Sequence, residues 1–353
     1  MADAEASATL SLRGLSRSFG GRPAVDGITL DIRLGELFTI VGPSGSGKST
    51  LIRMLAGLET PSSGQILLRG QRLDGVPANR RPTCMVFQSL ALFSLMSVGA
   101  NIEFALKMRG VAPDARRRRA LELMELLRLP SEFYGKPVTA CSGGERQRVA
   151  LARALASDPE ILFFDEPLSA IDYRLRKILE MEVKDLHRAT GKTFVYITHS
   201  LEEAMVMSDR IAVMRSGRIV QLGEPLEIYR RPKSRFVAEF MGEVNVIRLE
   251  QEGERWQAPE LALDLPIPPP DAKPGWMVLR PEHLRLLTAQ EPAGIAFEAI
   301  MFNDYVLGSR TQVHARRDGR TYIAELPAGI SLPQPGEPVR LGFDPADAVV
   351  VTE

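Results

Sequence analysis

The sequence predicts an α/β domain built on a parallel sheet, followed by a smaller all-β domain. Three short apolar runs, residues 37–41, 161–164 and 194–198, alternate with segments of helical pattern over the first two thirds of the chain. Continuous apolar strands between helices are typical of a parallel sheet that is covered on both faces. After Arg230, prolines crowd a region of short apolar runs, which indicates short strands joined by tight turns. A chain of 353 residues is long enough for two or three domains.

The composition argues against a nucleic-acid partner and against a disulfide framework. The chain carries 44 basic and 44 acidic residues, so its formal net charge is zero and no overall attraction to nucleic acid is expected. Four consecutive arginines at 116–119 have no aromatic residues among them, which favours a solvated helix face over a nucleic-acid contact. Cys84 and Cys141 are the only cysteines, as expected in a reducing cytosol.

The chain shows no targeting or membrane-spanning pattern. Asp3 and Glu5 stand where a secretory signal carries basic residues, and no apolar segment follows them. No stretch reaches the roughly 18 uninterrupted apolar residues that a membrane span needs. If the protein works at a membrane, we expect other chains to supply the span.

A nine-residue phosphate-loop pattern follows the first apolar run directly. Glycines let backbone N–H groups turn toward phosphate oxygens, and the N-terminus of the following helix, expected at residues 49–58, adds positive charge. We expect Lys48 to reach the β- and γ-phosphates, Ser49 to ligate Mg²⁺ and Thr50 to contact the α-phosphate. The alternative is a glycine-rich turn without a ligand, and the complete match argues against it. The pattern consists of Gly42, Pro43, Ser44, Gly45, Ser46, Gly47, Lys48, Ser49 and Thr50.

Two acids end the second apolar run. Asp165 is placed to hold Mg²⁺ through water. Glu166 is placed to activate the attacking water, since a carboxylate can accept its proton. For each of them the alternative is an acid that caps the turn before Pro167.

A second anion-binding pattern, Ser142, Gly143 and Gly144, precedes a helical stretch at residues 146–156. One triphosphate rarely needs two such cradles from one chain. We therefore expect this cradle to close on the γ-phosphate held by the Lys48 loop of a second copy, which predicts a symmetric dimer with two bound ATP. In isolation a Ser-Gly-Gly sequence is only a helix cap, and the matching run that continues to Arg153 favours the larger role.

With these residues assembled, the chain resembles the ATP-binding subunit of an ABC transporter over essentially its whole length. Residues 141–145 resemble the family signature Leu-Ser-Gly-Gly-Gln, with Cys141 in place of Leu and Glu145 in place of Gln. The resemblance adds Glu145 to the nucleotide-binding residues and gives ATP and Mg²⁺ as the cofactors. It implies hydrolysis of ATP coupled to transport, with Lys48, Glu166 and His199 as the catalytic residues.

Four further segments match family motifs in family order. Residues 86–89 resemble the loop whose glutamine, Gln88, touches Mg²⁺ and senses the transport subunit. Residues 169–172 resemble the loop that crosses the dimer and carries Asp172.

Residues 197–199 resemble the switch motif of the family. Its histidine, His199, would contact the γ-phosphate and hold Glu166 in its productive position. Residues 18–20 resemble the segment that stacks an aromatic ring, Phe19, on adenine. The alternatives are a core or surface histidine at 199 and a plain core residue at 19.

The resemblance also implies the domain organisation. We expect an ABC-type nucleotide-binding domain of the P-loop NTPase class at residues 9–240, with a helical subdomain at about 89–157. A β-rich regulatory domain with an OB-like fold is expected at residues 243–353. Its Arg280-Pro281-Glu282 sequence resembles the TOBE-type domain of importer ATPases for sugars, polyamines, iron and oxyanions.

Within this group, residues 79–88, 240–245 and 305–308 most resemble spermidine and putrescine importers. One segment departs from that pattern. Such importers usually read Ala-Leu-Phe-Pro-His after the glutamine, whereas Phe93 is followed by Ser94 and Leu95. This surface is expected to receive the coupling helix of a membrane subunit, so the change affects which permease the chain would drive.

The resemblance implies the energy-coupling ATPase of an import system, with polyamines as the favoured cargo. The expected partners are a second copy of the chain, two integral membrane permease subunits and an extracytoplasmic substrate-binding protein, without nucleic acid. The expected location is peripheral, on the cytoplasmic face of the inner (plasma) membrane.

Three alternatives stay open. The cargo could instead be a sugar, ferric iron or a sulfate- or phosphonate-type anion. The chain could be a soluble ABC protein that remodels ribosomes or DNA, although a single ATP cassette and zero net charge argue against this. The C-terminal domain could also be a sensor that binds a regulator or a small anion.

Overall fold

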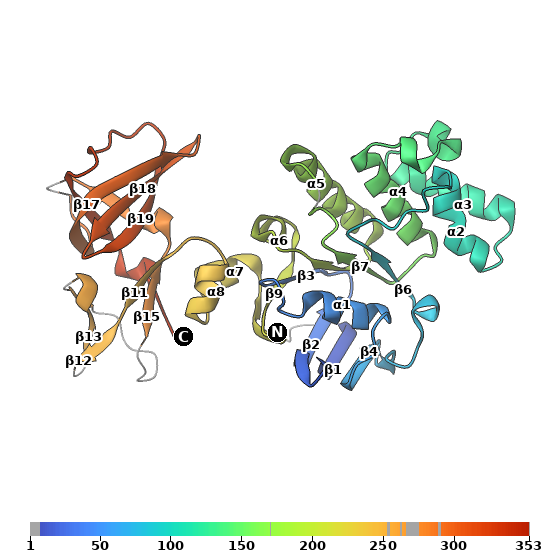
Figure 1. The fold of residues 1–353 in the computed structure, drawn as a ribbon, viewed down its shortest axis with the longest axis horizontal. Helices are drawn as coiled ribbons and strands as arrows, with labels where there is room; N and C mark the ends of the chain where they lie inside the picture. The colour runs from blue at the N-terminus through green and yellow to red at the C-terminus, as the bar shows by residue number, and fades with distance from the viewer. Residues whose placement is uncertain are drawn as a thin grey trace, which may run out of the picture. The chain divides into compact units, whose positions relative to one another are not determined.

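The computed structural model describes residues 8–169, 171–252, 255–261, 263–265, 275–288 and 291–352. The chain divides into two compact units, Met1–Pro225 and Leu226–Glu353 (Figure 1). The first unit mixes helices and sheets, and the second consists mainly of antiparallel strands. The predicted order, an α/β domain followed by a mainly β domain, is confirmed.

A six-stranded sheet forms the centre of the first unit. All neighbouring strands from β9 to β6 pair in parallel, and only the edge strand β10 is antiparallel to β9. This confirms the parallel sheet that the apolar runs predict. The strands are, in spatial order, β10 (Arg218–Gly223), β9 (Arg210–Arg215), β3 (Leu37–Val41), β8 (Thr193–Ile197), β7 (Ile161–Asp165) and β6 (Thr83–Val86).

The central strands are mostly apolar because each of their faces packs against a separate core. In β7, Ile161 and Phe163 belong to one core, whereas Leu162 and Phe164 belong to the other. The first core also contains residues of helix α1 (Lys48–Ala56) and of an antiparallel sheet. That sheet has the order β2 (Arg22–Arg33), β1 (Ala8–Phe19), β4 (Ser63–Leu68) and β5 (Gln71–Arg72).

Helices cover the opposite face of the sheet. In Figure 1, α2, α3 and α4 are grouped beside the β6 edge, and α5 and α6 lie along the sheet. Two short 3-10 helices, η2 (Ser131–Gly135) and η3 (Val138–Ala140), connect α3 to α4, and a third, η1 (Ala78–Arg80), precedes β6. The helices are α2 (Val98–Met108), α3 (Pro113–Leu126), α4 (Gly143–Ala156), α5 (Tyr173–Thr190) and α6 (Leu201–Met207).

Helix α1 ends at Ala56, two residues earlier than the sequence predicts, and begins one residue earlier. Gly57 follows with a left-handed φ of +80°, and a Cβ atom there would lie 2.5 Å from the Arg81 side chain. The buried Arg81 guanidinium donates to the Met54 and Leu55 carbonyls at 3.0 and 2.7 Å. The left-handed Gly57 therefore ends the helix, and an arginine from a distant segment satisfies the carbonyls of its last turn.

Helix α7 (Pro225–Arg230) starts at the last residue of the first unit. The second unit continues with α8 (Arg235–Phe240) and then with antiparallel sheets. Its core contains Trp256, Phe297 and Tyr322. The prolines between residues 266 and 274 lie outside the described residues. One sheet has the order β11 (Asn245–Arg248), β15 (Trp276–Leu279) and β21 (Val349–Val351), and a second has the order β12 (Glu250–Glu252), β13 (Arg255–Ala258) and β14 (Leu263–Leu265). The third has the order β16 (Arg285–Leu287), β20 (Pro338–Phe343), β17 (Ile295–Val306), β18 (Arg310–Arg317) and β19 (Arg320–Pro327). The 3-10 turns are η4 (Pro259–Leu261), η5 (Pro281–His283) and η6 (Pro345–Asp347).

Arg280 connects the two short helices to the sheets of the second unit. Its side chain is 7% exposed and lies over the ring of Tyr229, 4.1 Å from the centroid. It donates hydrogen bonds to the carbonyls of Tyr229, Ala238, Gly242 and Glu243 at 3.0–3.2 Å. The arginine of the Arg-Pro-Glu sequence therefore has a structural role within this unit.

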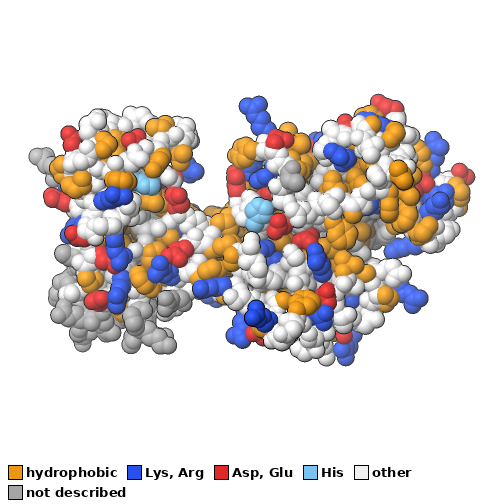
Figure 2. Space-filling view, in the orientation of Figure 1, with side chains coloured by type: hydrophobic (Ala, Val, Ile, Leu, Met, Phe, Trp, Pro, Cys, Tyr) orange, Lys and Arg blue, Asp and Glu red, His pale blue; other side chains and the backbone are white. Residues whose placement is uncertain are grey.

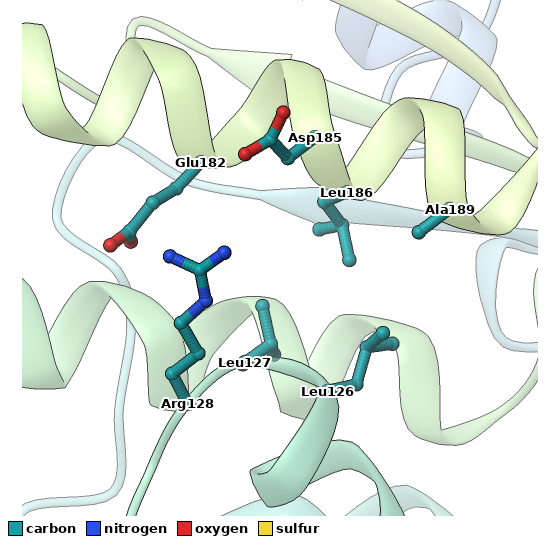
Figure 3. A pocket seen from close by; sticks show the side chains of 7 residues that line it. All are labelled: Leu126, Leu127, Arg128, Glu182, Asp185, Leu186 and Ala189. Atoms are coloured by element: carbon teal, nitrogen blue, oxygen red, sulfur yellow. The ribbon is translucent and has the colours of Figure 1, made fainter.

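Figure 2 shows acidic and basic side chains interspersed over the visible face of the molecule. No helix in the described part of the chain is long and apolar enough to cross a membrane. A small cavity of about 140 Å³ lies between the end of α3 and the side of α5, where Arg128 points toward the α5 acids Glu182 and Asp185 (Figure 3). None of the predicted site residues lines this cavity.

Candidate functional site

The phosphate loop connects the end of β3 to the start of α1. Gly47 is the N-cap of α1 and has a φ of +101°, and a Cβ atom there would lie 2.1 Å from the Ala24 carbonyl oxygen. Gly45 also has a positive φ, +76°, but no atom lies within 4 Å of its Cβ position. The loop is therefore packed against the protein on one side and open on the other, which is the geometry that a phosphate group requires.

Lys48 lies buried inside this loop. Its Nζ donates to the carbonyls of Gly42 and Pro43 at 2.7 and 3.1 Å. Burial lowers the pKa of Lys48, whereas the nearby acids Glu166 and Asp165 raise it. The Ser46 hydroxyl is buried and lacks a hydrogen-bond partner among the described residues. Ser44 is exposed, and Thr50, in the first turn of α1, is half-buried.

Asp165 ends β7 next to the first turn of α1. The Ser49 hydroxyl lies 3.5 Å from Asp165 Oδ1 and is oriented to donate to it. Burial raises the pKa of Asp165, and the positive charge of Arg53 opposes the rise. No group of three or more His, Cys, Asp or Glu side chains in the described ranges could hold a metal ion. One hydroxyl and one carboxylate suit a cation that takes its other oxygen ligands from phosphate and water, as Mg²⁺ does.

Glu166 and His199 meet where β7 and β8 end. His199 Nδ1 lies 3.1 Å from Glu166 Oε2. Glu166 has a φ of +47°, which is rare for a residue other than glycine, and its backbone N–H is bonded to the Ile197 carbonyl at 3.0 Å. The Glu166 carboxylate therefore bonds the His199 side chain. Among the described residues it does not cap the turn before Pro167, which was the alternative. The His199 side chain is 58% exposed, which excludes a core role.

A short chain of hydrogen bonds joins Gln88 to Glu166. Gln88 Nε2 donates to the Ser169 hydroxyl at 2.9 Å, and that hydroxyl donates to the Glu166 carbonyl at 3.0 Å. The loop after β6 is thus linked to the backbone of the acid that ends β7. A change in the position of this loop can reach Glu166 through two hydrogen bonds.

Sequence reasoning missed the residue that holds the loop after Gln88 in shape. Leu90 and Ala91 have positive φ angles of 60° and 46°. Arg153, on α4, donates to both of their carbonyls at 2.7 and 2.6 Å. An arginine in an otherwise apolar stretch of α4 was the available signal, but its partners lie more than 60 residues earlier in the sequence.

The signature residues form the N-terminus of α4. Ser142 Oγ accepts from the Glu145 N–H at 3.3 Å, and Glu145 Oε2 accepts from the Ser142 N–H at 2.8 Å, which is a capping box. The hydrogen bond from the Ser142 backbone lowers the pKa of Glu145. Gly143 is exposed and lines a groove of about 390 Å³ that Gln88 also borders, whereas Gly144 is buried.

The structure does not bring these signature residues to the phosphate loop of the same chain. Among the described residues, no hydrogen bond or ion pair joins residues 142–145 to residues 42–50. In the described part of the chain Asp172 likewise has no hydrogen bond or ion pair to the loop, and it caps α5, accepting from the Leu175 N–H at 3.1 Å. A single chain therefore assembles Lys48, Ser49, Asp165, Glu166 and His199, but not Ser142 or Asp172.

Phe19 lies at the end of β1, before a turn formed by Gly20 and Gly21. Its side chain is 48% exposed, so the alternative of a plain core residue is wrong. The Arg17 guanidinium lies 4.7 Å from the centroid of the ring. An exposed ring with one free face can stack on a flat heterocycle.

Family models match both units of the chain. Residues 25–169 match the model described as ABC transporter, and residues 277–351 match the TOBE domain. The Fe(3+) ions import ATP-binding protein FbpC of Streptomyces avermitilis is 39% identical over 343 residues, which cover 97% of this chain and 98% of that protein. The spermidine/putrescine import ATP-binding protein PotA of Pseudomonas aeruginosa is 47% identical over 293 residues, which cover 78% of each chain. PotA of Bacillus cereus is 42% identical over 283 residues, which cover 80% of this chain and 79% of that protein.

Solved structures share the fold of the first unit. The ATP-binding cassette MJ0796, described as dimeric in a post-hydrolysis state with ADP and Pi, is 29% identical with a TM-score of 0.54, covering 61% of this chain and 98% of that one. CbiO1 from Clostridium perfringens, described as part of the ABC transporter complex cbiONQ, is 28% identical with a TM-score of 0.58, covering 63% of this chain and 91% of that one. The chain belongs to the ABC transporter family and is an ATP-binding subunit that hydrolyses ATP.

Proposed function

We propose that ATP is cleaved where β3, β7 and β8 end, with Glu166 as the general base. The observation that carries this proposal is the 3.1 Å contact between His199 and Glu166 beside the buried Lys48. Glu166 accepts a proton from the attacking water, and His199 holds the carboxylate in position and contacts the γ-phosphate. Lys48 and the N–H groups of the loop stabilise negative charge on the phosphates.

Mg²⁺ is part of the proposed site. Ser49 and Asp165 would ligate it directly or through water, and Gln88 would join them when its loop moves toward the nucleotide. The cation offsets charge on the β- and γ-phosphates when it is bound. Phe19 would stack on the adenine ring, which its exposed face supports.

The proposed active form is a symmetric dimer that holds two ATP molecules. The support is that, among the described residues, no hydrogen bond or ion pair joins residues 142–145 to the loop around Lys48 within one chain. The N-terminus of α4 would complete the site of the second copy, and Asp172 would cross to it. The dimer described for the MJ0796 cassette is in line with this arrangement.

The proposed assembly adds two integral membrane permeases and an extracytoplasmic substrate-binding protein, with this chain on the cytoplasmic face of the inner membrane. The names of its relatives as import ATP-binding proteins support this. Leu95 is fully exposed and Phe93 is 37% exposed, beside the groove that Gln88 borders. Exposed apolar side chains next to a groove suit a docking site for a membrane subunit.

The proposed cargo is a polyamine of the spermidine and putrescine type. The PotA proteins of Pseudomonas aeruginosa and Bacillus cereus support it, and FbpC of Streptomyces avermitilis supports ferric iron as the second candidate. Cells that lack the native chain should lose uptake of labelled putrescine and spermidine and keep uptake of ferric iron. Loss of iron uptake with intact polyamine uptake would favour the second candidate.

The proposed base is tested with Glu166→Gln. The amide keeps an oxygen near His199 but cannot accept the proton, so kcat should fall at least about 100-fold while ATP still binds. Glu160→Gln is the matched control, because Glu160 precedes the opposite end of β7 and its side chain pairs with Arg69 on the surface. A Glu166→Gln chain that hydrolyses ATP at the native rate would exclude Glu166 as the base.

A further inference from the structure

Glu203 is a buried acid close to the proposed switch histidine. It occupies the third position of α6, and its side chain is only 3% exposed. Its neighbour Glu202 is exposed and pairs with Lys177 at 2.6 Å. Two adjacent glutamates on one helical turn thus have opposite surroundings. A buried carboxylate costs free energy unless hydrogen bonds satisfy it, so the bonds of Glu203 need a reason.

Two hydroxyl groups from the strand β8 region satisfy Glu203. Its Oε2 accepts from Thr198 Oγ1 at 2.7 Å and from Tyr196 OH at 3.2 Å. Both donors are buried. Burial raises the pKa of Glu203, and the hydrogen bonds from the Thr198 and Tyr196 hydroxyls oppose the rise.

The same network holds the backbone on both sides of His199. The Thr198 hydroxyl, besides donating to Glu203, accepts from the Ser200 N–H at 2.9 Å. Ser200 Oγ in turn accepts from the Glu203 N–H at 3.3 Å. The residues immediately before and after His199 are therefore bonded to each other and to Glu203, while the His199 side chain itself is free to reach Glu166.

The hydrogen bonds among Tyr196, Thr198, Ser200 and Glu203 are local, which argues against a general stabilising role in the core. Every bond joins residues no more than seven positions apart, so the network fastens little besides the turn that carries His199. An apolar residue at position 203 would fill the same space without the cost of a buried acid.

We propose that Glu203 is a positioning residue for ATP hydrolysis: through Thr198 it fixes the turn around His199 and so sets where the imidazole meets Glu166. The inference rests on the proposed role of His199. Glu203 does not touch the reacting atoms, and its effect passes through the backbone of residues 198–200. Tyr196 has a supporting part, because among the described residues its hydroxyl bonds the Glu203 carboxylate and no group of the turn.

The test compares three changes in the full-length chain by steady-state ATPase kinetics and ATP binding. Glu203→Leu removes the acceptor and should lower kcat by about 10-fold or more, with ATP affinity within about twofold of native. Glu203→Gln keeps one oxygen that accepts from both hydroxyls, so it should rescue kcat to within about threefold. Glu202→Gln, one position earlier on the exposed face, should match the native chain.

A double-mutant cycle separates this proposal from the proposed function. In a His199→Ala background, Glu203→Leu should cause almost no further loss of kcat. An equal further loss would overturn the positioning role and leave the role of His199 standing. If His199→Ala alone keeps native kcat, the proposed function of His199 fails instead.

A second variant covers the case in which Glu203→Leu does not fold. Thr198→Val keeps the shape of the side chain and removes the hydroxyl that joins Glu203 to Ser200, and it should lower kcat more than Tyr196→Phe does. Native kcat in a folded Thr198→Val chain, with thermal unfolding as the check, would overturn the proposal.

Discussion

Arg280→Met should destabilise the second unit without changing nucleotide binding. Methionine fills a similar volume but cannot donate to the four carbonyls that Arg280 now satisfies. The hydrogen bond to the Ala238 carbonyl is buried and the other three are partly buried, so water can replace only some of the lost bonds. At about 1–3 kcal/mol for each acceptor that stays unpaired, we expect a loss of about 3–5 kcal/mol.

The assay uses the two tryptophans of the chain, Trp256 and Trp276, which both lie in the second unit. Urea unfolding followed by tryptophan fluorescence therefore reports this unit alone. With a slope of about 2 kcal/mol per molar urea, a loss of about 4 kcal/mol lowers the midpoint by about 2 M.

Arg285→Met is the matched control for this measurement. Arg285 lies in the same unit, is half exposed and is 3.8 Å from its partner Glu291, so its removal should cost no more than about 0.5 kcal/mol. A loss below about 1 kcal/mol for Arg280→Met would refute the view that this arginine fastens α7 and α8 to the sheets.

Three further predictions concern the first unit. Gly47→Ala should abolish ATP binding, measured by titration calorimetry, because the added Cβ would collide with the Ala24 carbonyl; retained binding would contradict the described loop packing. Phe19→Ala should raise KM for ATP about 10-fold with kcat nearly unchanged, since only the proposed ring stacking is lost, and an unchanged KM would exclude stacking. Arg153→Met should release Leu90 and Ala91, the two left-handed residues after Gln88. Transport by the assembled system should then fall more than the ATPase rate of the chain alone. Equal losses of transport and ATPase rate would contradict a role of this loop in coupling.

The sequence predicted the features that depend on local patterns. Apolar runs and glycine spacing indicated β3, β7, β8 and the phosphate loop, because strands buried on both faces are apolar at most positions. The resemblance of residues 197–199 to the switch motif of the family also implied that His199 belongs with Glu166, although 33 residues separate them. In the structure their side chains lie 3.1 Å apart.

Features that depend on tertiary contacts were not predicted. Arg81 satisfies the last turn of α1, and Arg153 holds the shape of the loop after Gln88. In both cases the partner atoms come from distant parts of the chain. An aromatic residue at a strand end can face either side, so the exposure of Phe19 could not be decided from its type. Glu202 and Glu203 are identical in sequence terms, and only the fold distinguishes the surface acid from the buried one.

The most direct test of the proposed shared site is a crosslink between two copies of the chain. In a Glu166→Gln chain with Cys84 and Cys141 replaced by alanine, one tagged copy carries Ser44→Cys and a second, differently tagged copy carries Ser142→Cys. With ATP bound, a short bifunctional maleimide should join the two tagged copies into one band, whereas Glu160→Cys in place of Ser44→Cys should give none. Absence of that band in chains that demonstrably hold ATP would contradict a pocket built from two copies.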